Sequence, residues 1–301
     1  MAPDNSDREF RLARGQRALN IPFEITDGGH IFLRVRVNNS EPLWFGLDSG
    51  AEQTLISTRQ AQALKLKLYG EAQATGGGEK TVDFSSAKNV SFDVSGLNFK
   101  LKEVGVLPLD FASPVAGTAL AGILGYDFIS RFVVEIDYPN KIINLYHPRS
   151  YRYRGRGDIV PIKMLDNNPY IAAKVRLPGL APVSGMFLID SGANTDIFFN
   201  SPFVEKHKLL TSSQETTEAQ TEAIGGTNKI RIGYATGIQI GKAVILKPVA
   251  HFSLATQGTD ASDIGAGFIG GKLLRQFKVV IIDQARHRLI LEPSAQTRIM
   301  R

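Results

Sequence analysis

The pentapeptide Leu47-Asp48-Ser49-Gly50-Ala51 returns later in the same chain as Ile189-Asp190-Ser191-Gly192-Ala193, 142 residues further on. Each copy follows a short apolar run and places a carboxylate, a hydroxyl and a glycine in direct succession. A single Asp-Ser-Gly is common in turns, because Asp and Ser side chains bond to nearby backbone there. Two copies at matching places in one chain of 301 residues instead predict a paired site.

Three further features repeat in the same order around this pentapeptide. A Gly-x-x-Gly, an apolar run ending in Asp, and a glycine patch each occur twice: 122–125 and 267–270, 133–137 and 279–283, Gly76-Gly77-Gly78 and Gly225-Gly226. Constant order and nearly constant spacing predict a duplicated domain of about 130–140 residues. We therefore expect an N-terminal extension (1–19), a first lobe (20–148), a basic linker (149–158), a second lobe (159–292) and a C-terminal tail (293–301).

Each half has the alternating or β-branched pattern of half-buried strands. Strands are expected at 31–37, 45–47, 54–57, 132–137 and 141–146, and at 171–177, 187–189, 195–198, 277–283 and 288–292. Short helices are expected near 60–64, capped by Ser57 or Thr58, and at 126–131 and 271–276. The glycine patches fall where hairpin tips belong. The predicted fold is all-β, with two similar lobes related by a pseudo-twofold axis and a few short helices.

Composition excludes several function classes. The chain is 43% hydrophobic and 21% charged, and it contains no cysteine, so thiol catalysis and zinc–cysteine or iron–sulfur sites are excluded. The five histidines show no paired metal spacing, and we expect neither a metal nor a cofactor. No apolar run approaches the roughly 18 residues of a membrane-spanning helix, so no integral membrane segment is expected.

Charge is uneven along the chain. The formal net charge is +6, and residues 151–301 carry 19 basic and 12 acidic side chains. The densest basic stretch, 149–157, alternates arginines with Tyr151 and Tyr153. We interpret it as a solvated linker, with an electrostatic strip for an anionic surface as the alternative, and we expect no nucleic-acid partner. The polar N-terminus lacks a signal-peptide core, which leaves a cytoplasmic protein or a processed periplasmic or secreted one.

The paired motifs have a clear chemical use. If the lobes bring Asp48 and Asp190 face to face, the two carboxyl groups cannot both ionise cheaply and share one proton. The ionised member then activates a water molecule while the protonated member polarises a carbonyl group. The supporting residues are Ser49, Gly50, Ser191 and Gly192; the glycine patches are expected to be flaps over the cleft, and Glu52 and Asn194 to contact substrate.

These motifs resemble those of the aspartic proteases, specifically a bacterial retropepsin-like branch with two halves fused in one chain. The resemblance covers residues 20–292 and implies endopeptidase activity on extended peptides, by a chain that is active as a monomer. Ser replaces the commoner Thr after each Asp. Tyr126 and Gly271 stand where retroviral members carry Arg, and Tyr69 lies well before the glycines, unlike the flap tyrosine of pepsin-like enzymes.

Two other readings of the paired carboxylates are open. One is a catalytically weak peptide- or polymer-binding module that keeps the fold. The other is a glycosidase pair, which requires carboxyl groups about 5–9.5 Å apart. The separation of Asp48 and Asp190 distinguishes a shared-proton pair from a glycosidase pair.

Overall fold

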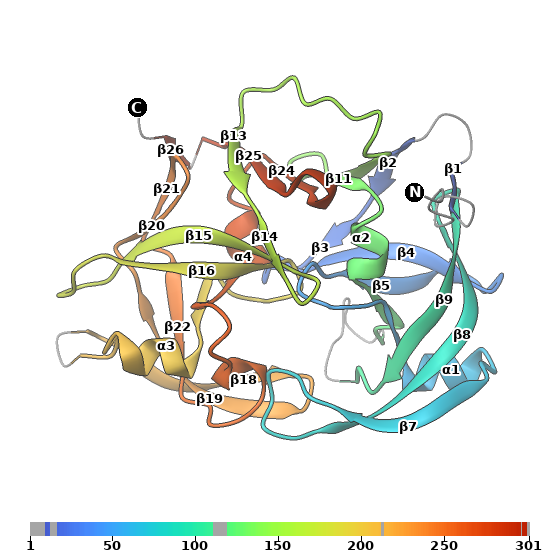
Figure 1. Cartoon of the computed structure of the whole chain (residues 1–301), viewed down its shortest axis with the longest axis horizontal. Coiled ribbons are helices and arrows are strands. Elements are labelled where there is room, and N and C mark those ends of the chain that lie inside the picture. Colours follow the sequence, from blue (N-terminus) through green and yellow to red (C-terminus); the bar gives the residue numbers. More distant parts are fainter. Residues whose placement is uncertain (1–9, 13–16, 111–118, 212–213, 296, 300–301) are drawn as a thin grey trace, which may run out of the picture.

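A computed structural model describes residues 10–12, 17–110, 119–211, 214–295 and 297–299 of the chain (Figure 1). In this part of the chain, β-strands dominate, and the α-helices number four, each of six residues or fewer. The expected all-β class is confirmed. The expected extension at 1–9 and 13–16, and the tail at 296 and 300–301, lie outside the described residues.

The first sheet is built only from the first part of the chain. Its described strands follow the order β1-β9-β6-β10-β5-β4-β8-β7, with β3 paired to β4. Their bounds are β1 Phe10–Leu12, β3 Glu24–Ile25, β4 Ile31–Val37, β5 Leu43–Leu47, β6 Leu55–Ser57, β7 Leu68–Ala74, β8 Val82–Val94, β9 Leu97–Leu107 and β10 Gly122–Leu124. Burial alternates along β4 as expected for a strand with one face on the core.

The second sheet repeats this plan with residues 163–299. Its described strands follow the order β18-β19-β22-β17-β23-β16-β15-β20-β21-β26, with β14 paired to β15. Their bounds are β14 Lys163–Leu165, β15 Asn168–Arg176, β16 Val183–Asp190, β17 Ile197–Phe199, β18 Thr217–Ala223, β19 Gly226–Tyr234, β20 Gly237–Ile240, β21 Ala243–Leu246, β22 Val249–Ser253, β23 Gly267–Gly270 and β26 Arg298–Ile299. In both sheets a Gly-x-x-Gly strand lies parallel to the strand that leads to an aspartate.

The third sheet joins the two parts of the chain. Its order is β13-β25-β24-β11-β12-β2, and it lies in the upper part of Figure 1. The bounds are β2 Arg17–Pro22, β11 Val133–Asp137, β12 Ile142–Tyr146, β13 Asp158–Pro161, β24 Val279–Asp283 and β25 Arg288–Glu292. The two closing strand pairs expected from the repeat are confirmed, and they meet where β11 pairs antiparallel with β24. The boundary expected at residue 20 falls inside β2.

The short helices follow the expected signals. Helix α1 (Thr58–Ala63) begins after Ser57, whose hydroxyl accepts the Gln60 amide at 3.2 Å. Helices α2 (Tyr126–Ile129) and α4 (Gly271–Leu274) each start directly after a Gly-x-x-Gly, and α3 (Ser201–Lys206) follows β17. None of the helices in the described ranges has the length and apolar character needed to cross a membrane.

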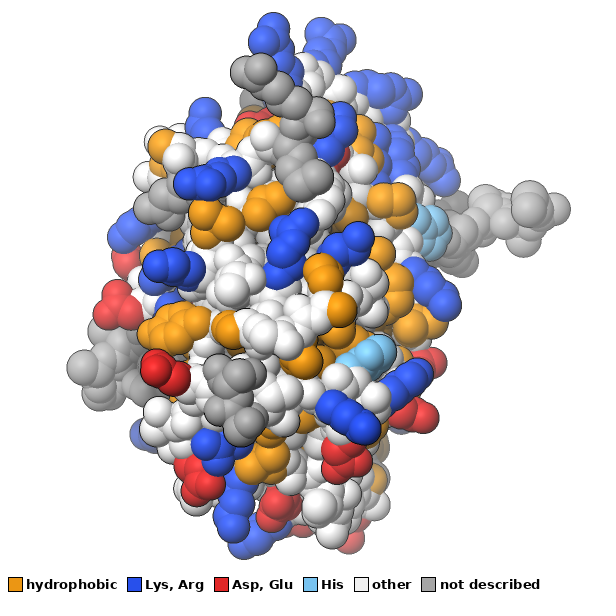
Figure 2. All heavy atoms as spheres, turned by 90° about the vertical axis from the view of Figure 1, so that its left-hand side faces the viewer, with side chains coloured by type: hydrophobic (Ala, Val, Ile, Leu, Met, Phe, Trp, Pro, Cys, Tyr) orange, Lys and Arg blue, Asp and Glu red, His pale blue; other side chains and the backbone are white. Residues whose placement is uncertain are grey.

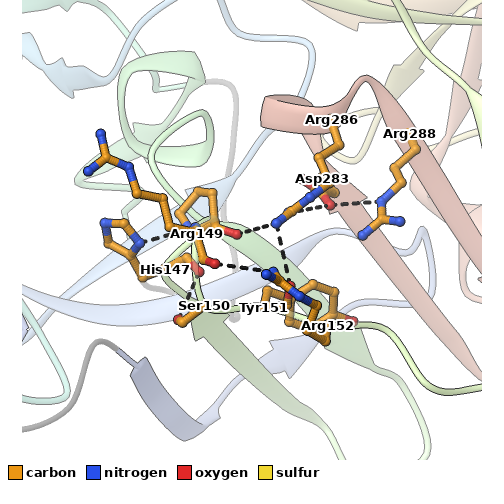
Figure 3. A network of polar contacts seen from close by, with 9 residues as sticks. His147, Arg149, Ser150, Tyr151, Arg152, Asp283, Arg286 and Arg288 are labelled. Atoms are coloured by element: carbon orange, nitrogen blue, oxygen red, sulfur yellow. Dashed lines mark hydrogen bonds and ion pairs between the residues drawn. The ribbon is translucent and has the colours of Figure 1, made fainter.

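The basic linker is anchored near its start, where Tyr151 packs against the third sheet (Figure 3), while Arg149, Arg152, Arg154 and Arg156 are exposed. Tyr151 is buried, with 8% of its surface exposed. The Arg286 guanidinium donates to the carbonyls of Pro148 (2.5 Å) and Tyr151 (3.4 Å). Asp283, fully buried on β24, accepts from Arg286 (3.0 Å) and Arg288 (2.8 Å). The linker is therefore pinned to the third sheet by a buried carboxylate acting through Arg286.

Basic side chains are spread over one face of the molecule. Figure 2 shows the left-hand side of Figure 1, where β20, β21, β26 and α3 lie, with Lys and Arg side chains across its upper part and acidic side chains mainly below. The basic residues of 151–301 come from many separate segments of the sequence, so this charge is not confined to the linker.

Candidate active site

The two repeated aspartates occupy matching positions in the first two sheets. Asp48 follows β5, and its amide donates to the carbonyl of Leu124 at 3.1 Å. Asp190 ends β16, opposite Gly270 of β23. A Cβ atom on Gly125 would lie 2.3 Å from the Gln53 carbonyl oxygen, and one on Gly270 would lie 2.2 Å from that of Thr195. The Gly-x-x-Gly strands therefore need glycine to pass close to the aspartate turns.

Each Asp-Ser-Gly forms a tight turn that holds its own carboxylate. The Gly50 amide donates to Asp48 Oδ1 at 2.8 Å, and the Gly192 amide donates to Asp190 Oδ1 at 2.9 Å. Each glycine also faces the other aspartate. A Cβ atom on Gly50 would lie 2.8 Å from Asp190 Cγ, and one on Gly192 would lie 2.4 Å from Asp48 Cγ. The structure thus brings the two turns into direct contact.

The two serines exchange hydrogen bonds between the turns. The Ser49 amide donates to Ser191 Oγ at 3.0 Å, and the Ser191 amide donates to Ser49 Oγ at 3.1 Å. Ser49 Oγ donates to the Ile189 carbonyl at 2.6 Å, and Ser191 Oγ donates to that of Leu47 at 2.8 Å. Both residues are 1% exposed, so this four-bond network lies away from water.

Burial and proximity act together on the two carboxyl groups, each of which faces the glycine of the other turn. Burial raises the pKa of Asp190 well above its usual range, and the neighbouring Asp48 charge raises it further. Burial also raises the pKa of Asp48, while the hydrogen bond from Gly50, the interaction with Asp190 and the charge of His30 oppose that rise. Two neighbouring carboxyl groups with raised pKa values are able to share one proton at pH values at which an isolated carboxyl group is ionised.

The glycine patches lie at two hairpin tips that touch each other. The amides of Gly78 and Lys80 donate to the carbonyls of Ile224 and Gly225, both at 2.9 Å. The longer stretch of sequence between Asp190 and its glycine patch, compared with that after Asp48, predicts a longer second hairpin, and this prediction is wrong. Strands β7 and β18 each have seven residues, and the additional residues between Asp190 and the second tip precede β18.

Three residues outside the repeated motifs hold the first tip in place. The Thr259 amide donates to the Gly76 carbonyl at 2.9 Å, and Asn228 Nδ2 donates both to the Gly77 carbonyl and to Asp260 Oδ2, the latter at 3.1 Å. Asp260 is 6% exposed, and burial raises its pKa to about 6. Its charge also raises the pKa of Asp190, less than burial and Asp48 do, so a third carboxyl group influences the pair. Nothing in the motif pattern pointed to these residues.

Asn194 and Glu52, the two expected substrate contacts, each lie near residues of the opposite half of the chain. A Cβ atom on Gly28 would lie 2.2 Å from Asn194 Cγ, so Asn194 packs on the turn between β3 and β4. Glu52 is exposed, and its charge acts on the Tyr170 phenol at the start of β15. The turn between β3 and β4 also carries His30, another site residue that sequence reasoning missed. Among the described residues, no three His, Asp or Glu side chains come together as metal ligands would.

Comparison with known families supports the first half of this site. Residues 33–128 match a family model described as aspartyl protease, a stretch that runs from β4 through Asp48 and the first hairpin to α2. A search among curated proteins found no match.

Proposed function

We propose that this protein is an aspartic endopeptidase of two fused retropepsin-like halves, in which Asp48 and Asp190 share a proton and activate water. The observation that carries the proposal is the pair of buried carboxyl groups at the ends of matching strands, each in contact with the glycine of the other's turn. The aspartyl protease match over residues 33–128 supports it. Carboxyl groups whose turns are in direct contact leave no room for the water or sugar ring that a glycosidase pair must accommodate.

The reaction follows from a shared proton. The ionised carboxylate removes a proton from water as the water oxygen attacks the peptide carbonyl, and the protonated carboxyl group donates to the carbonyl oxygen. Collapse of the resulting diol breaks the C–N bond as the first carboxyl group passes its proton to the leaving nitrogen. No covalent enzyme intermediate forms, which agrees with buried serines whose hydroxyl groups are already committed to backbone carbonyls.

The reciprocal serine contacts and the repeated sheet plan support two lobes, 20–148 and 159–292, related by a pseudo-twofold axis. In this arrangement Ser49, Gly50, Ser191 and Gly192 hold the dyad, the glycine tips cover an extended peptide, and Glu52 and Asn194 flank it. Because one chain supplies both aspartates, the monomer is the active species. Bacterial origin and a periplasmic or secreted location stay predictions from the sequence.

The test is a cleavage-site profile on a proteome-derived peptide library between pH 3 and 8. Asp48→Asn and Asp190→Asn should each lower activity by at least about 10²–10⁴-fold, and by similar amounts. The double variant should be hardly worse than either single one, because the two residues act as a unit. Asp263→Asn, at an exposed position, is the matched control. Near-normal activity of Asp48→Asn would refute the two-aspartate mechanism, and peptide binding without cleavage by the wild type would favour a binding module.

A further inference from the structure

The register of each strand pair places a different residue at the level of each aspartate. The β4–β5 pairing ends at Phe32 and Gly46, and continuing this register by two residues brings His30 to the level of Asp48. The β15–β16 pairing ends at Tyr170 and Leu188, and the same extension brings Asn168 to the level of Asp190. The corresponding position therefore holds an imidazole in one half and an amide in the other.

The turn that carries His30 is held firmly. The Thr26 amide donates to the His30 carbonyl at 3.1 Å, and the His30 amide donates to Thr26 Oγ1 at 3.3 Å. Arg275, from the second half, donates to the Thr26 carbonyl at 3.1 Å. A Cβ atom on Gly29 would lie 2.4 Å from the Gly271 carbonyl carbon, so the turn is pressed against α4. These contacts fix where the imidazole sits.

The imidazole interacts with both dyad turns. Electrostatically, it acts on Asp48 of one turn and on the Gly192 backbone of the other. The Phe32 ring stands edge-on to it, with centroids 6.1 Å apart. Burial lowers the pKa of His30, and the Asp48 charge opposes that fall.

Asp190 has the opposite surroundings. The ionisable groups that act on it are Asp48 and Asp260, and it in turn acts on the Tyr170 phenol. None of these three groups ever carries a positive charge, so none of them favours the ionised form of Asp190. An imidazole therefore acts on Asp48, while the ionisable groups that act on Asp190 are acidic.

We propose that His30 is a positioning residue that assigns the roles within the aspartate pair, keeping the negative charge on Asp48 and the proton on Asp190. This rests on the proposed peptidase function. Asp48 then takes the proton of water as the new C–O bond forms, and Asp190 gives its proton to the carbonyl oxygen. On collapse, Asp190 regains a proton from the diol, and Asp48 passes its own to the leaving nitrogen as the C–N bond breaks.

The location of the charge can be tested without measuring activity. The protein is labelled at histidine and the imidazole signals are followed by NMR against pH, with the His30 signal assigned by its loss in His30→Asn. Asp48→Asn should lower the pKa of His30 by about one unit, because an opposite charge within a few ångströms shifts a pKa by at least that much. Asp190→Asn should leave it unchanged or raise it. Equal falls in the two variants would overturn the assignment.

The kinetic test uses His30→Asn, which makes the residue at the level of Asp48 the same as that at the level of Asp190. The acid limb of kcat/KM against pH should move up by about one unit, since Asp48 loses the charge that favours its ionised form. His251→Asn, at a half-buried histidine on β22, is the control and should leave the limb in place. His30→Gln serves if His30→Asn does not fold.

The two proposals fail in different ways. An unmoved acid limb in both His30 variants, with activity still abolished by Asp48→Asn, overturns the role of His30 and leaves the peptidase intact. If the wild type cleaves no peptide, the peptidase proposal fails, and the NMR titration alone decides where the charge lies.

Discussion

Ser49 and Ser191 each accept the other's backbone amide and each donate to the carbonyl that precedes the other's aspartate. Loss of one hydroxyl therefore leaves an amide and a carbonyl unpaired in the opposite turn. Because both sites are buried, water does not replace the missing partner. The aspartate turns are coupled as one unit through these two side chains.

Ser49→Ala and Ser191→Ala should each lower the free energy of unfolding by about 1–3 kcal/mol, the cost of leaving buried polar groups unpaired. The double variant should lose less than the sum, because both changes remove parts of one network. Urea unfolding measures all three, with Ser150→Ala, at an exposed hydroxyl, as control. Strict additivity would show that the two hydroxyl groups act independently.

Asp260→Asn should change how stability depends on pH. Burial raises the pKa of Asp260 to about 6, so the folded protein holds this proton more tightly than the unfolded chain, which releases it near pH 4. Stability is then lost as pH rises from about 4 to about 6. The variant lacks this loss. Its free energy of unfolding, minus that of the wild type, should therefore rise by about 2–3 kcal/mol from pH 3.5 to pH 7.

Urea unfolding at several pH values checks this difference. The raised pKa values of Asp48 and Asp190 also make the free energy of unfolding fall as pH rises, in the variant as in the wild type. The effect of Asp260 is therefore the difference in unfolding free energy between the two proteins. Asp263→Asn, three residues away and exposed, should show no such change. A difference that does not vary with pH would mean that Asp260 titrates like a solvent-exposed carboxylate.

Gly78→Ala should separate the hairpin tips. The added Cβ atom would lie 2.2 Å from the Gly225 carbonyl carbon, so backbone has to move. The amides at positions 78 and 80 then lose their acceptors on the other hairpin, and hydrogen exchange across residues 76–82 should speed up. Glu79→Ala, an exposed neighbour, is the control. Unchanged exchange at these amides would show that their protection does not depend on contact between the tips.

Arg286→Ala should expose the linker to trypsin, which cleaves after arginine. The change removes the donor to the Pro148 and Tyr151 carbonyls, while Arg149, Arg152, Arg154 and Arg156 supply cleavage sites. Arg288→Ala is the matched control, since Arg288 shares Asp283 with Arg286 without bonding these carbonyls. Mass spectrometry of early digestion products should show linker cleavage in the first variant and little in the second. Equal linker cleavage in the two variants would mean that the ion pairs of Asp283, and not the bonds from Arg286 to the two carbonyls, hold the linker.

Local pattern predicted the elements that carry an aspartate or a repeated glycine. Strand β4 was found at its observed bounds because apolar and charged side chains alternate along it. Strands β8 and β9 were missed, although their signal is present: Phe92, Val94, Leu97 and Phe99 are buried on either side of a Ser-Gly turn with positive φ at both residues. The alternation of apolar residues on both sides of this turn is a sequence signal that predicts the hairpin.

Tertiary contacts account for what the sequence could not predict. The repeat identified Asp48 and Asp190, because each lies in a duplicated motif. His30, Asn228 and Asp260 lie outside the repeated sequence motifs, and only the folded chain brings them near the aspartates and the hairpin tips. The burial of Tyr151 within the linker has a similar origin, since strands distant in sequence cover this ring.

The pairing of β11 with β24 has a consequence for synthesis of the chain. When the first half has left the ribosome, β11 presents an open edge whose Val133, Val134 and Ile136 are all buried in the finished protein. Such an edge pairs with any available strand, including the same strand of another nascent molecule. A fragment ending near residue 148 is therefore expected to self-associate through β11, and correct assembly depends on the second half arriving before a neighbouring chain does.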